Sequence, residues 1–344
     1  MDKISELKLI LSDQNRKPLH QIVRELIHCA FIEREIPSYY FTSLLFKEGT
    51  GNYKDYIGYK KVSKIQKEVY FKQGKTESLI NKLKFADVLR ENEVPTPLIL
   101  ANSNGFELYA DDAIINIENA QKLEEEIDKL ILKSQHNSIF VKKIDGFGGF
   151  NAFKFAKERI DNQKVDDLFK LMSKYKFIFE ETVFQHEKVN QIYADSINTV
   201  RVHTFKEADK ISLVSALMRF GGNGSVVDNI SSGGCFVPVN ISDWSLGSRG
   251  ISFLEYGGHI YTKHPDTGYK FEGFKIPYGD QIAAVAEKAA LLFDNAFIGW
   301  DVVITNEGPT IIEGNQNPHI IMTQIACGGF KQHPVFKEIF KDFI

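Results

Sequence analysis

The segment IGWDVVITNEGPTIIEGNQNP, residues 298–318, constrains the fold more than any other part of the chain. Two apolar runs flank the turn signal Asn-Glu-Gly, and this pattern predicts two antiparallel strands joined by a hairpin. Side chains at i and i+2 of a strand point to the same face, so Glu313 and Asn315 leave the second strand side by side. Asp301 begins the first strand, and the pairing brings it to the same end of the hairpin.

Three oxygen-bearing side chains in one place predict a site for a hard cation. Asp301, Glu313 and Asn315 supply carboxylate and amide oxygens, which are ligands that Mg²⁺ accepts. One or two such ions that hold a triphosphate suit this set. Two alternatives stay open. One is a strand end followed by a polar turn, and the other is a pair of carboxylates for acid–base work, which leaves Asn315 without a role.

A second candidate lies in FVKKIDGFGGFNAF, where the strand expected over 138–143 ends in two lysines before a glycine-rich loop. Glycines let backbone N–H groups approach phosphate oxygens, and a strand lysine adds a positive charge. The G-x-x-x-x-G-K-[ST] pattern does not occur here, so this is not a Walker loop. Strand neighbours alternate, so if Lys142 faces a cleft, Lys143 faces away. The alternative is a glycine hairpin turn beside exposed lysines.

The 344 residues suffice for two or three lobes, and the periodicity predicts an α+β fold in three parts. Residues 1–93 are mainly helical, with helices over 18–35 and 76–92, the second stopped by two prolines. Residues 94–183 form a small lobe with strands near 97–100, 138–143 and 177–183 and helices near 118–133 and 162–174. Residues 184–344 form a larger lobe with strands near 198–205, 211–220, 299–305 and 309–315 and a helix near 280–294.

Composition excludes several classes of protein. A net charge of -3 gives no overall electrostatic reason to bind nucleic acid or an anionic membrane. No apolar run reaches the length of a membrane span, and the N-terminus has no signal-peptide core. Three cysteines far apart in the sequence argue against a disulfide framework. We therefore expect a soluble cytoplasmic protein.

The strand lysine, the glycine-rich loop and, far downstream, D-x₁₁-E-x-N-x-x-P together resemble the ATP-grasp superfamily. The closest resemblance is to its sugar-transfer-associated branch, which the segments VPTP, SINTVRVHTF, VVDNISSGG and HPDTG also resemble. The likeness spans roughly residues 80–320 and implies an ATP-grasp fold, in which two α+β lobes hold ATP between them. The first 80 residues lie outside it.

The resemblance implies roles for the residues on the nucleotide side. Lys142 matches the strand lysine that contacts the phosphates, as a binding and catalytic residue. Lys82 resembles an earlier phosphate-contacting lysine, although Asn81 stands before it where Asp is usual. The loop that closes over the phosphates corresponds to Gly146, Gly148 and Gly149. The segment FEETVFQHE resembles the hinge between the lobes, and its candidates for adenine and ribose contacts are Glu180, Glu181, Val183 and Glu187.

The resemblance also assigns the metal ligands and an acceptor side. Asp301, Glu313 and Asn315 match the ligands of one or two Mg²⁺ ions, with Glu313 between the two. Arg201, on the strand NTVRVHTF, is the second catalytic candidate because an arginine can hold a transferring phosphoryl group or a carboxylate. Its alternative is an ion pair that stabilises the lobe, and Arg219 is a second cation near it.

The predicted substrate contacts are polar or glycine residues of the third part, namely Asn198, Asp228, Asn229, Gly234 and His264. Each has a structural alternative. Asn198 and Thr199 suit a strand cap equally well, residues 228–234 suit a plain connection between strands, and a lone histidine such as His264 is more often structural.

The reaction that the resemblance implies is ATP-dependent carboxylate–amine ligation. A substrate carboxylate attacks the γ-phosphorus to give an acyl phosphate and ADP, and an amine, such as that of an amino sugar or glycan precursor, then forms an amide. Two other classes stay open: an ATP-grasp phosphotransferase that acts on a non-carboxylate acceptor, and a nucleotide-binding module without catalysis.

Overall fold

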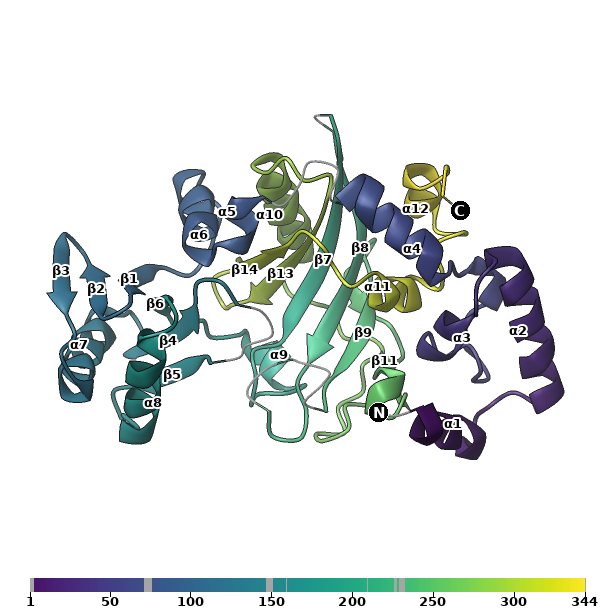
Figure 1. Cartoon of the computed structure of the whole chain (residues 1–344), viewed down its shortest axis with the longest axis horizontal. Helices are drawn as coiled ribbons and strands as arrows, with labels where there is room; N and C mark the ends of the chain where they lie inside the picture. Colours follow the sequence, from purple (N-terminus) through teal and green to yellow (C-terminus); the bar gives the residue numbers. More distant parts are fainter. Residues whose placement is uncertain are drawn as a thin grey trace.

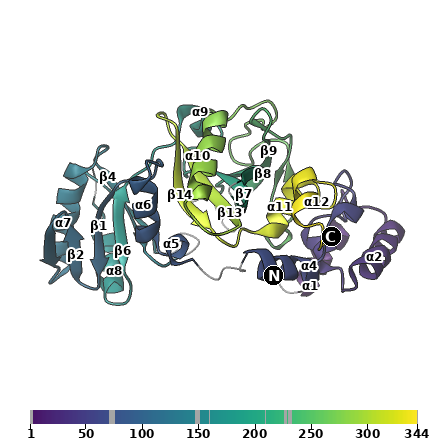
Figure 2. The same cartoon turned by 90° about the horizontal axis from the view of Figure 1, so that it is seen from above.

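Two antiparallel sheets flanked by helices make up the chain (Figure 1). The structure is a computed structural model, and it describes residues 3–70, 76–146, 151–158, 160–208, 210–225, 228 and 233–343. Helices and antiparallel strands occur together, so the predicted α+β class is confirmed. In both views the six-stranded sheet lies at one end, the eight-stranded sheet in the middle and the N-terminal helices at the other end (Figures 1 and 2).

The six-stranded sheet has the order β3-β2-β1-β6-β4-β5. Its strands are β1 (Ile99–Asn104), β2 (Glu107–Ala110), β3 (Ala113–Asn116), β4 (Ser138–Lys143), β5 (Phe153–Ala156) and β6 (Phe177–Glu181). The sequence predicted β4 and β6 but missed β2, β3 and β5, since strands of four residues give almost no periodic signal. Helices α7 (Ala120–Lys133) and α8 (Asn162–Met172) bury their apolar residues against this sheet.

The eight-stranded sheet has the order β12-β11-β9-β8-β7-β13-β14, and β10 pairs with β9. Its strands are β7 (Thr199–Glu207), β8 (Lys210–Phe220), β9 (Cys235–Asn240), β10 (Ser245–Leu246), β11 (Gly250–Ile251), β12 (Ile260–Tyr261), β13 (Phe297–Ile304) and β14 (Pro309–Asn315). The predicted hairpin is confirmed, because β13 and β14 pair antiparallel across the turn at 305–308. The sequence predicted β7, β8, β13 and β14 and missed the shorter strands β9–β12.

Both faces of the eight-stranded sheet are covered, because alternate residues of its strands are apolar on each side. Val202 and Trp300 pack in one cluster with α10 (Gly279–Leu291) and α6 (Lys82–Glu91). Val214 and Phe297 pack in another cluster with helices from both ends of the chain. These helices are α1 (Lys3–Ser12), α2 (Leu19–Glu33), α3 (Ser38–Thr42), α4 (Tyr59–Ile65), α11 (Ile320–Cys327) and α12 (Pro334–Ile339). The N-terminal helices therefore rest on the same sheet that carries the predicted metal ligands, and the predicted boundaries at 93/94 and 183/184 stay predictions.

The single helix predicted over 76–92 is broken into α5 (Glu77–Ile80) and α6. Asn81 causes the break: its backbone is extended, and its Oδ1 accepts hydrogen bonds from the N–H groups of Leu83 and Lys84, both at 3.1 Å. Asparagine is poor inside a helix but is among the best N-cap residues. This cap places Lys82 in the first turn of α6, between the two sheets (Figure 2).

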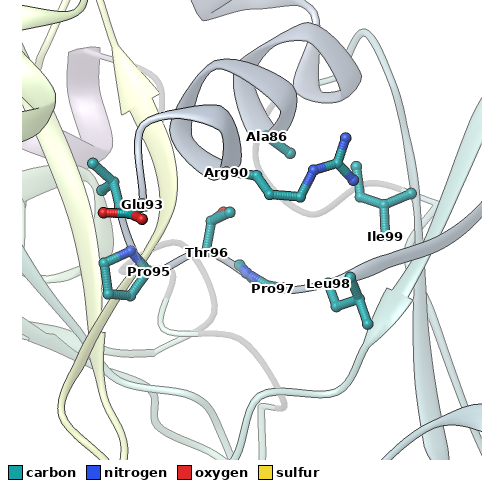
Figure 3. Close-up of a pocket in the computed structure, with 9 residues that line it drawn as sticks. Ala86, Arg90, Glu93, Pro95, Thr96, Pro97, Leu98 and Ile99 are labelled. Carbon is teal, nitrogen blue, oxygen red and sulfur yellow. The ribbon is translucent and has the colours of Figure 1, made fainter.

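The connection from α6 to β1 is bonded to both sheets. The carbonyl of Pro95 accepts a hydrogen bond from the N–H of Ile311 in β14 at 2.9 Å, and that of Leu98 accepts one from Glu181 in β6 at 2.9 Å. A cavity of about 300 Å³ opens beside this connection (Figure 3). Its lining residues are Ala86, Arg90, Glu93, Val94, Pro95, Thr96, Pro97, Leu98 and Ile99. None of these is a predicted site residue, so the cavity marks the junction of the sheets and not the candidate site.

Within the described ranges, no helix is both long and apolar enough to cross a bilayer.

Candidate active site

The β13–β14 pairing brings the three predicted metal ligands together. Asp301 lies directly opposite Glu313, and Gly299 lies opposite Asn315. The amide nitrogen of Asn315 is 3.5 Å from Oδ2 of Asp301. Asp301 sits in the middle of β13 and not at its start as the sequence suggested, since β13 already begins at Phe297. The close placement of the three side chains follows from the antiparallel register.

Two arginines hold the carboxylate of Asp301. Arg201 donates from Nε to Oδ1 and from Nη2 to Oδ2, the latter at 3.0 Å, and Nη2 of Arg219 lies 3.1 Å from Oδ2. The Asp301 side chain is only 3% exposed. Burial acts to raise the pKa of Asp301, but the charges of the two arginines outweigh it and hold this pKa below its usual range. Asp301 is therefore ionised and fully engaged by arginine.

The network continues from Arg219 to Asp228. Nε of Arg219 is 3.3 Å from Oδ2 of Asp228, and the same oxygen accepts hydrogen bonds from the hydroxyl and the N–H of Thr199. Burial raises the pKa of Asp228 although Arg219 acts to lower it. We call Arg201, Asp301, Arg219 and Asp228 the arginine–aspartate network. Asp228, predicted as a substrate contact, here holds Arg219 and Thr199 in place.

Gly299 makes room for the Arg201 side chain. A Cβ at Gly299 would lie 3.1 Å from Cδ of Arg201 and 2.8 Å from Cβ of Pro318. Arg201 stands opposite Asp301 in the β7–β13 register, and its side chain reaches the carboxylate beside this glycine. Arg201 thus forms the ion pair that was the alternative to a catalytic role. Through this pair with Asp301, its guanidinium lies beside the predicted metal ligands.

His203 shares the strand face of Arg201 and bonds to neighbouring elements. Its Nδ1 is 3.0 Å from Oγ of Ser215, and its Nε2 is 3.2 Å from Oγ1 of Thr323 in α11. Burial, together with the charge of Arg201, lowers the pKa of His203 to about 3, so the ring is neutral. The sequence analysis missed His203, but the alternation that separates Arg201 from Val200 and Val202 would have placed it on the same face.

The predicted phosphate lysines lie across from the hairpin. Nζ of Lys82 is 3.7 Å from Oε1 of Glu313 and also donates to the carbonyl of Gly146. Nζ of Lys142 is 2.7 Å from Oε1 of Glu180, which stands on the neighbouring strand β6. Burial lowers the pKa of Lys82 and raises that of Glu180, and the charges of Glu313 and Lys142 respectively oppose these shifts. We call Lys82, Lys142, Glu180 and Glu313 the lysine–glutamate cluster.

Lys143 faces away from this cluster. Its Nζ lies 3.6 Å from the centre of the Tyr175 ring, in a cation–π contact near the end of α8. The alternation expected for Lys142 and Lys143 is therefore present in β4.

The four residues predicted to contact the adenine and the ribose do not share one location. Glu181 lies next to Glu180, so its side chain leaves the opposite face of β6, where Oε1 accepts a hydrogen bond from the N–H of Gln135 at 3.0 Å. Val183 is half-buried in the loop after β6, and Glu187 is exposed at the start of α9 (Glu187–Asn190). Of these residues, only Glu180 belongs to the lysine–glutamate cluster.

Two predicted substrate contacts, Asn198 and His264, are buried and make hydrogen bonds within the protein. Asn198 is fully buried, and it bonds Gln185, Ser196, the carbonyl of Tyr193 and the N–H of Gly221. His264 is 1% exposed; its Nε2 lies 2.9 Å from the carbonyl of Gly221, and its Nδ1 faces the N–H groups of Asp266 and Thr267. Both arrangements match the structural alternatives.

The glycines of the prediction are only partly described. Gly234 is buried where the chain enters β9, and Gly146 follows β4. Gly148, Gly149 and Asn229 lie outside the described residues.

The family of sugar-transfer associated ATP-grasp proteins matches residues 65–335. The chain belongs to this family. The match covers the lysine–glutamate cluster and the arginine–aspartate network together, and the predicted ATP-grasp fold is thereby confirmed. A comparison with curated proteins finds no match.

Solved structures similar to this ATP-grasp protein share few of its residues. D-alanyl-alanine synthetase A from Vibrio cholerae is 12% identical with a TM-score of 0.45, over 77% of this chain and 63% of that chain. The ADP complex of purK, an N5-carboxyaminoimidazole ribonucleotide synthetase, is 13% identical with a TM-score of 0.43, over 76% and 52%. The ATP-grasp ligase PsnB, complexed with a minimal precursor, Mg and ADP, is 12% identical with a TM-score of 0.40, over 78% and 60%. The chain thus spans less than two thirds of the length of each of these proteins.

The residues present fit Mg²⁺ in part. Glu313 is 29% exposed at its side chain and Asn315 is half-buried, so neither side chain is sealed off from an ion. Among the described residues, no group of three or more His, Cys, Asp or Glu side chains lies around one point. Asp301 fits only if an arginine leaves its carboxylate, so its role as a ligand stays a prediction.

Proposed function

We propose that this ATP-grasp protein is an ADP-forming carboxylate–amine ligase. The observation that carries the proposal is the approach of Lys82 to Glu313 at 3.7 Å, with Lys142 nearby in β4. The two lysines suit the oxygens of a triphosphate, and the Glu313 carboxylate and the Asn315 amide suit a divalent ion bound to it. Ser-His-Asp or Cys-His chemistry is not needed, because positioning and charge neutralisation supply most of the acceleration.

Lys142 and Lys82 bind the phosphate oxygens in this proposal. Lys142 exchanges its contact with Glu180 for an oxygen of the triphosphate, and burial of Glu180 favours this exchange because it already disfavours the ionised carboxylate. Glu180 is then left to accept a hydrogen bond from the nucleotide base. The carbonyl of Gly146 accepts a hydrogen bond from Lys82, and the glycine-rich segment that follows, whose residues 147–149 lie outside the described ranges, would close over the phosphates in this proposal.

Glu313 and Asn315 would hold Mg²⁺, with Asp301 as a third ligand. When bound, Mg²⁺ supplies charge neutralisation on the triphosphate. Arg201 lies beside these residues and would hold the transferring phosphoryl group. The network fixes its guanidinium before any substrate arrives.

The reaction proceeds in two displacements. A carboxylate oxygen of the first substrate attacks the γ-phosphorus, the bond to the bridging oxygen breaks, and ADP leaves with that electron pair. The amine nitrogen of the second substrate then attacks the acyl carbon, the C–O bond to phosphate breaks, and the amine loses a proton. The family description associates these proteins with sugar transfer, so we propose an amino sugar or a glycan precursor as the amine and the cytoplasm, where ATP is supplied, as the location.

A substrate-pool experiment tests this function. Purified protein is incubated with ATP, Mg²⁺ and pools of amino acids, sugar acids and amino sugars, and ADP is measured. ADP release that requires both a carboxylate and an amine, with a new amide detected by mass spectrometry, is the expected result. A phosphorylated product without an amide would show a phosphotransferase instead, and tight ATP binding without turnover would show a binding module.

A further inference from the structure

Helix α2 buries two glutamates beside Ile22 and Cys29, and it exposes a row of apolar residues. Its buried residues include Glu25 and Glu33, which are 3% and 5% exposed. Its exposed residues include Leu19, Val23, Ile27 and Phe31, and Phe31 is 82% exposed. A surface helix normally buries its apolar stripe and exposes its charges, so the outer face of α2 needs an explanation that the fold does not give.

The buried glutamates are well paired, so the orientation of α2 is fixed by the protein. Glu25 accepts hydrogen bonds from Lys17 at 2.9 Å and from the hydroxyl of Tyr40 at 2.6 Å. Glu33 accepts hydrogen bonds from Lys331 at 2.6 Å and from the N–H of Gly58 at 3.1 Å. Rotating α2 to bury its apolar stripe would expose these pairs and break them.

The exposed apolar residues form a stripe along one side of α2. Leu19, Val23, Ile27 and Phe31 follow one another at intervals of four, which places them in one inclined row. Ile36, just beyond the helix, is 87% exposed and extends the row. In both views α2 lies at the end of the molecule far from the six-stranded sheet (Figures 1 and 2). We call this row, with Ile36, the α2 stripe.

The most exposed charges near the α2 stripe in sequence are basic. Over residues 3–36, every charged side chain that is classed as exposed is basic, namely Lys3, Lys8, Arg24 and Arg34. The acidic side chains of that range are buried or half-buried. Helix α1, which precedes α2 in sequence, carries Lys3 and Lys8 and adds the exposed residues Leu7 and Leu11. Exposed apolar residues whose fully exposed charged neighbours in sequence are basic match an anionic lipid surface, where the apolar row enters the acyl boundary and the basic side chains meet phosphate.

A second copy of the chain is a poorer match. The row from Leu19 to Phe31 centres near residue 25, so a two-fold axis through it would bring the two Arg24 side chains together. Like charges at the centre of an interface cost binding energy. From the exposed apolar row and the basic residues near it in sequence, we infer that the α2 stripe binds peripherally to an anionic membrane surface. This inference does not depend on the proposed ligase activity, and it is consistent with a net charge of -3, because only the local charge is basic.

Vesicle flotation tests the inference with the full chain. The probes are vesicles of phosphatidylcholine alone and vesicles with about 30 mol% phosphatidylglycerol. The wild type should float with the anionic vesicles, and about 0.5 M NaCl should weaken this binding. Ile27→Ser with Phe31→Ser should lower the bound fraction about tenfold or more. Arg24→Glu should lower binding to the anionic vesicles only. Ile114→Ser is the matched control, since Ile114 is 67% exposed on β3 at the other end of the molecule.

Three results would overturn the inference. The first is a wild type that does not float with anionic vesicles. The second is a double variant that floats as well as the wild type. The third is a wild-type dimer in sedimentation equilibrium that the double variant does not form, which would assign the α2 stripe to a second copy. All substituted side chains are exposed, so an unfolded variant is not expected, and circular dichroism of each variant checks this.

Discussion

The two sides of the candidate site arrange their charges differently. On the lysine side, Lys142 pairs with Glu180 within the six-stranded sheet, and Lys82 of α6 meets Glu313 of β14 at 3.7 Å. On the eight-stranded sheet, the arginine–aspartate network alternates two cations and two anions, and its Asp301 side chain is 3% exposed. A single pair exchanges partners easily, whereas a buried network holds its members in one geometry. The comparison suggests that the lysine side captures the nucleotide and the arginine side orients the reacting groups.

Asp301→Asn is expected to have the largest effect, because it leaves two buried arginines without their shared counter-charge. We predict a loss of about 3–5 kcal/mol in the free energy of unfolding, as for other broken buried ion pairs. Urea denaturation monitored by fluorescence measures this loss. Glu180→Gln on the lysine side should lower the same quantity by less, because it weakens one ion pair where Asp301→Asn weakens two. Equal losses for the two variants would remove the distinction between the two sides.

Glu313→Ala is expected to act on turnover and not on the fold. Its side chain is 29% exposed and its contact with Lys82 is long, so stability should change by less than about 1 kcal/mol. ADP release should fall about 100-fold, or about 2.7 kcal/mol in activation free energy. Glu307→Ala, at an exposed position in the turn of the same hairpin, is the control. Near-normal turnover of Glu313→Ala would contradict the proposal that Glu313 is a metal ligand.

The titration of His203, on the arginine side, should make the free energy of unfolding depend on pH. Its pKa in the folded chain is about 3, below its ordinary value of 6.5, because burial and Arg201 disfavour the charged ring. The unfolded chain therefore binds more protons between these values, so this stabilisation is complete above pH 6.5 and is lost as the pH falls toward 3. The slope from one group is at most about 1.4 kcal/mol per pH unit. His203→Gln should flatten the measured curve over this range, and an unchanged slope would contradict the neutral, buried histidine.

Asn81→Ala should have the smallest effect, because it removes only the N-cap that positions Lys82. We expect a loss of about 1 kcal/mol in unfolding free energy, measured by thermal denaturation. Asn81→Asp should be close to neutral, since the two residues cap helices equally well. Because Asn and Asp cap helices equally well, Asn81 can occupy the position where the resemblance expects Asp. A large loss for Asn81→Asp would mean that the amide group itself is needed.

Local patterns predicted the parts of the site that lie close together in sequence. The hairpin signal placed Asp301 opposite Glu313, and strand alternation separated Lys142 from Lys143, because both depend on neighbours within one or two strands. The strands β4 and β14 were predicted for the same reason. The resemblance extended this to Lys82, which no local signal would have connected to Glu313.

Long-range contacts could not be predicted in this way. Arg201 and Asp301 are a hundred positions apart in sequence, and only the order of β7 and β13 in the sheet brings them together. The sequence left both roles open for Asn198 and His264, since burial decides between a substrate contact and a structural hydrogen bond. The exposed apolar row of α2 also escaped the periodicity, which shows that a helix has two faces but not which one the fold buries.

Calorimetric titration of Mg·ATP into the wild type, Lys142→Ala and Lys143→Ala tests the central claim most directly. The two lysines are adjacent in β4 and differ mainly in the face from which they leave the strand, so each is the control for the other. The account predicts that Lys142→Ala raises the Kd about tenfold or more, while Lys143→Ala changes it less than about threefold. A larger effect at Lys143, or no effect at Lys142, would contradict a nucleotide site between the two sheets.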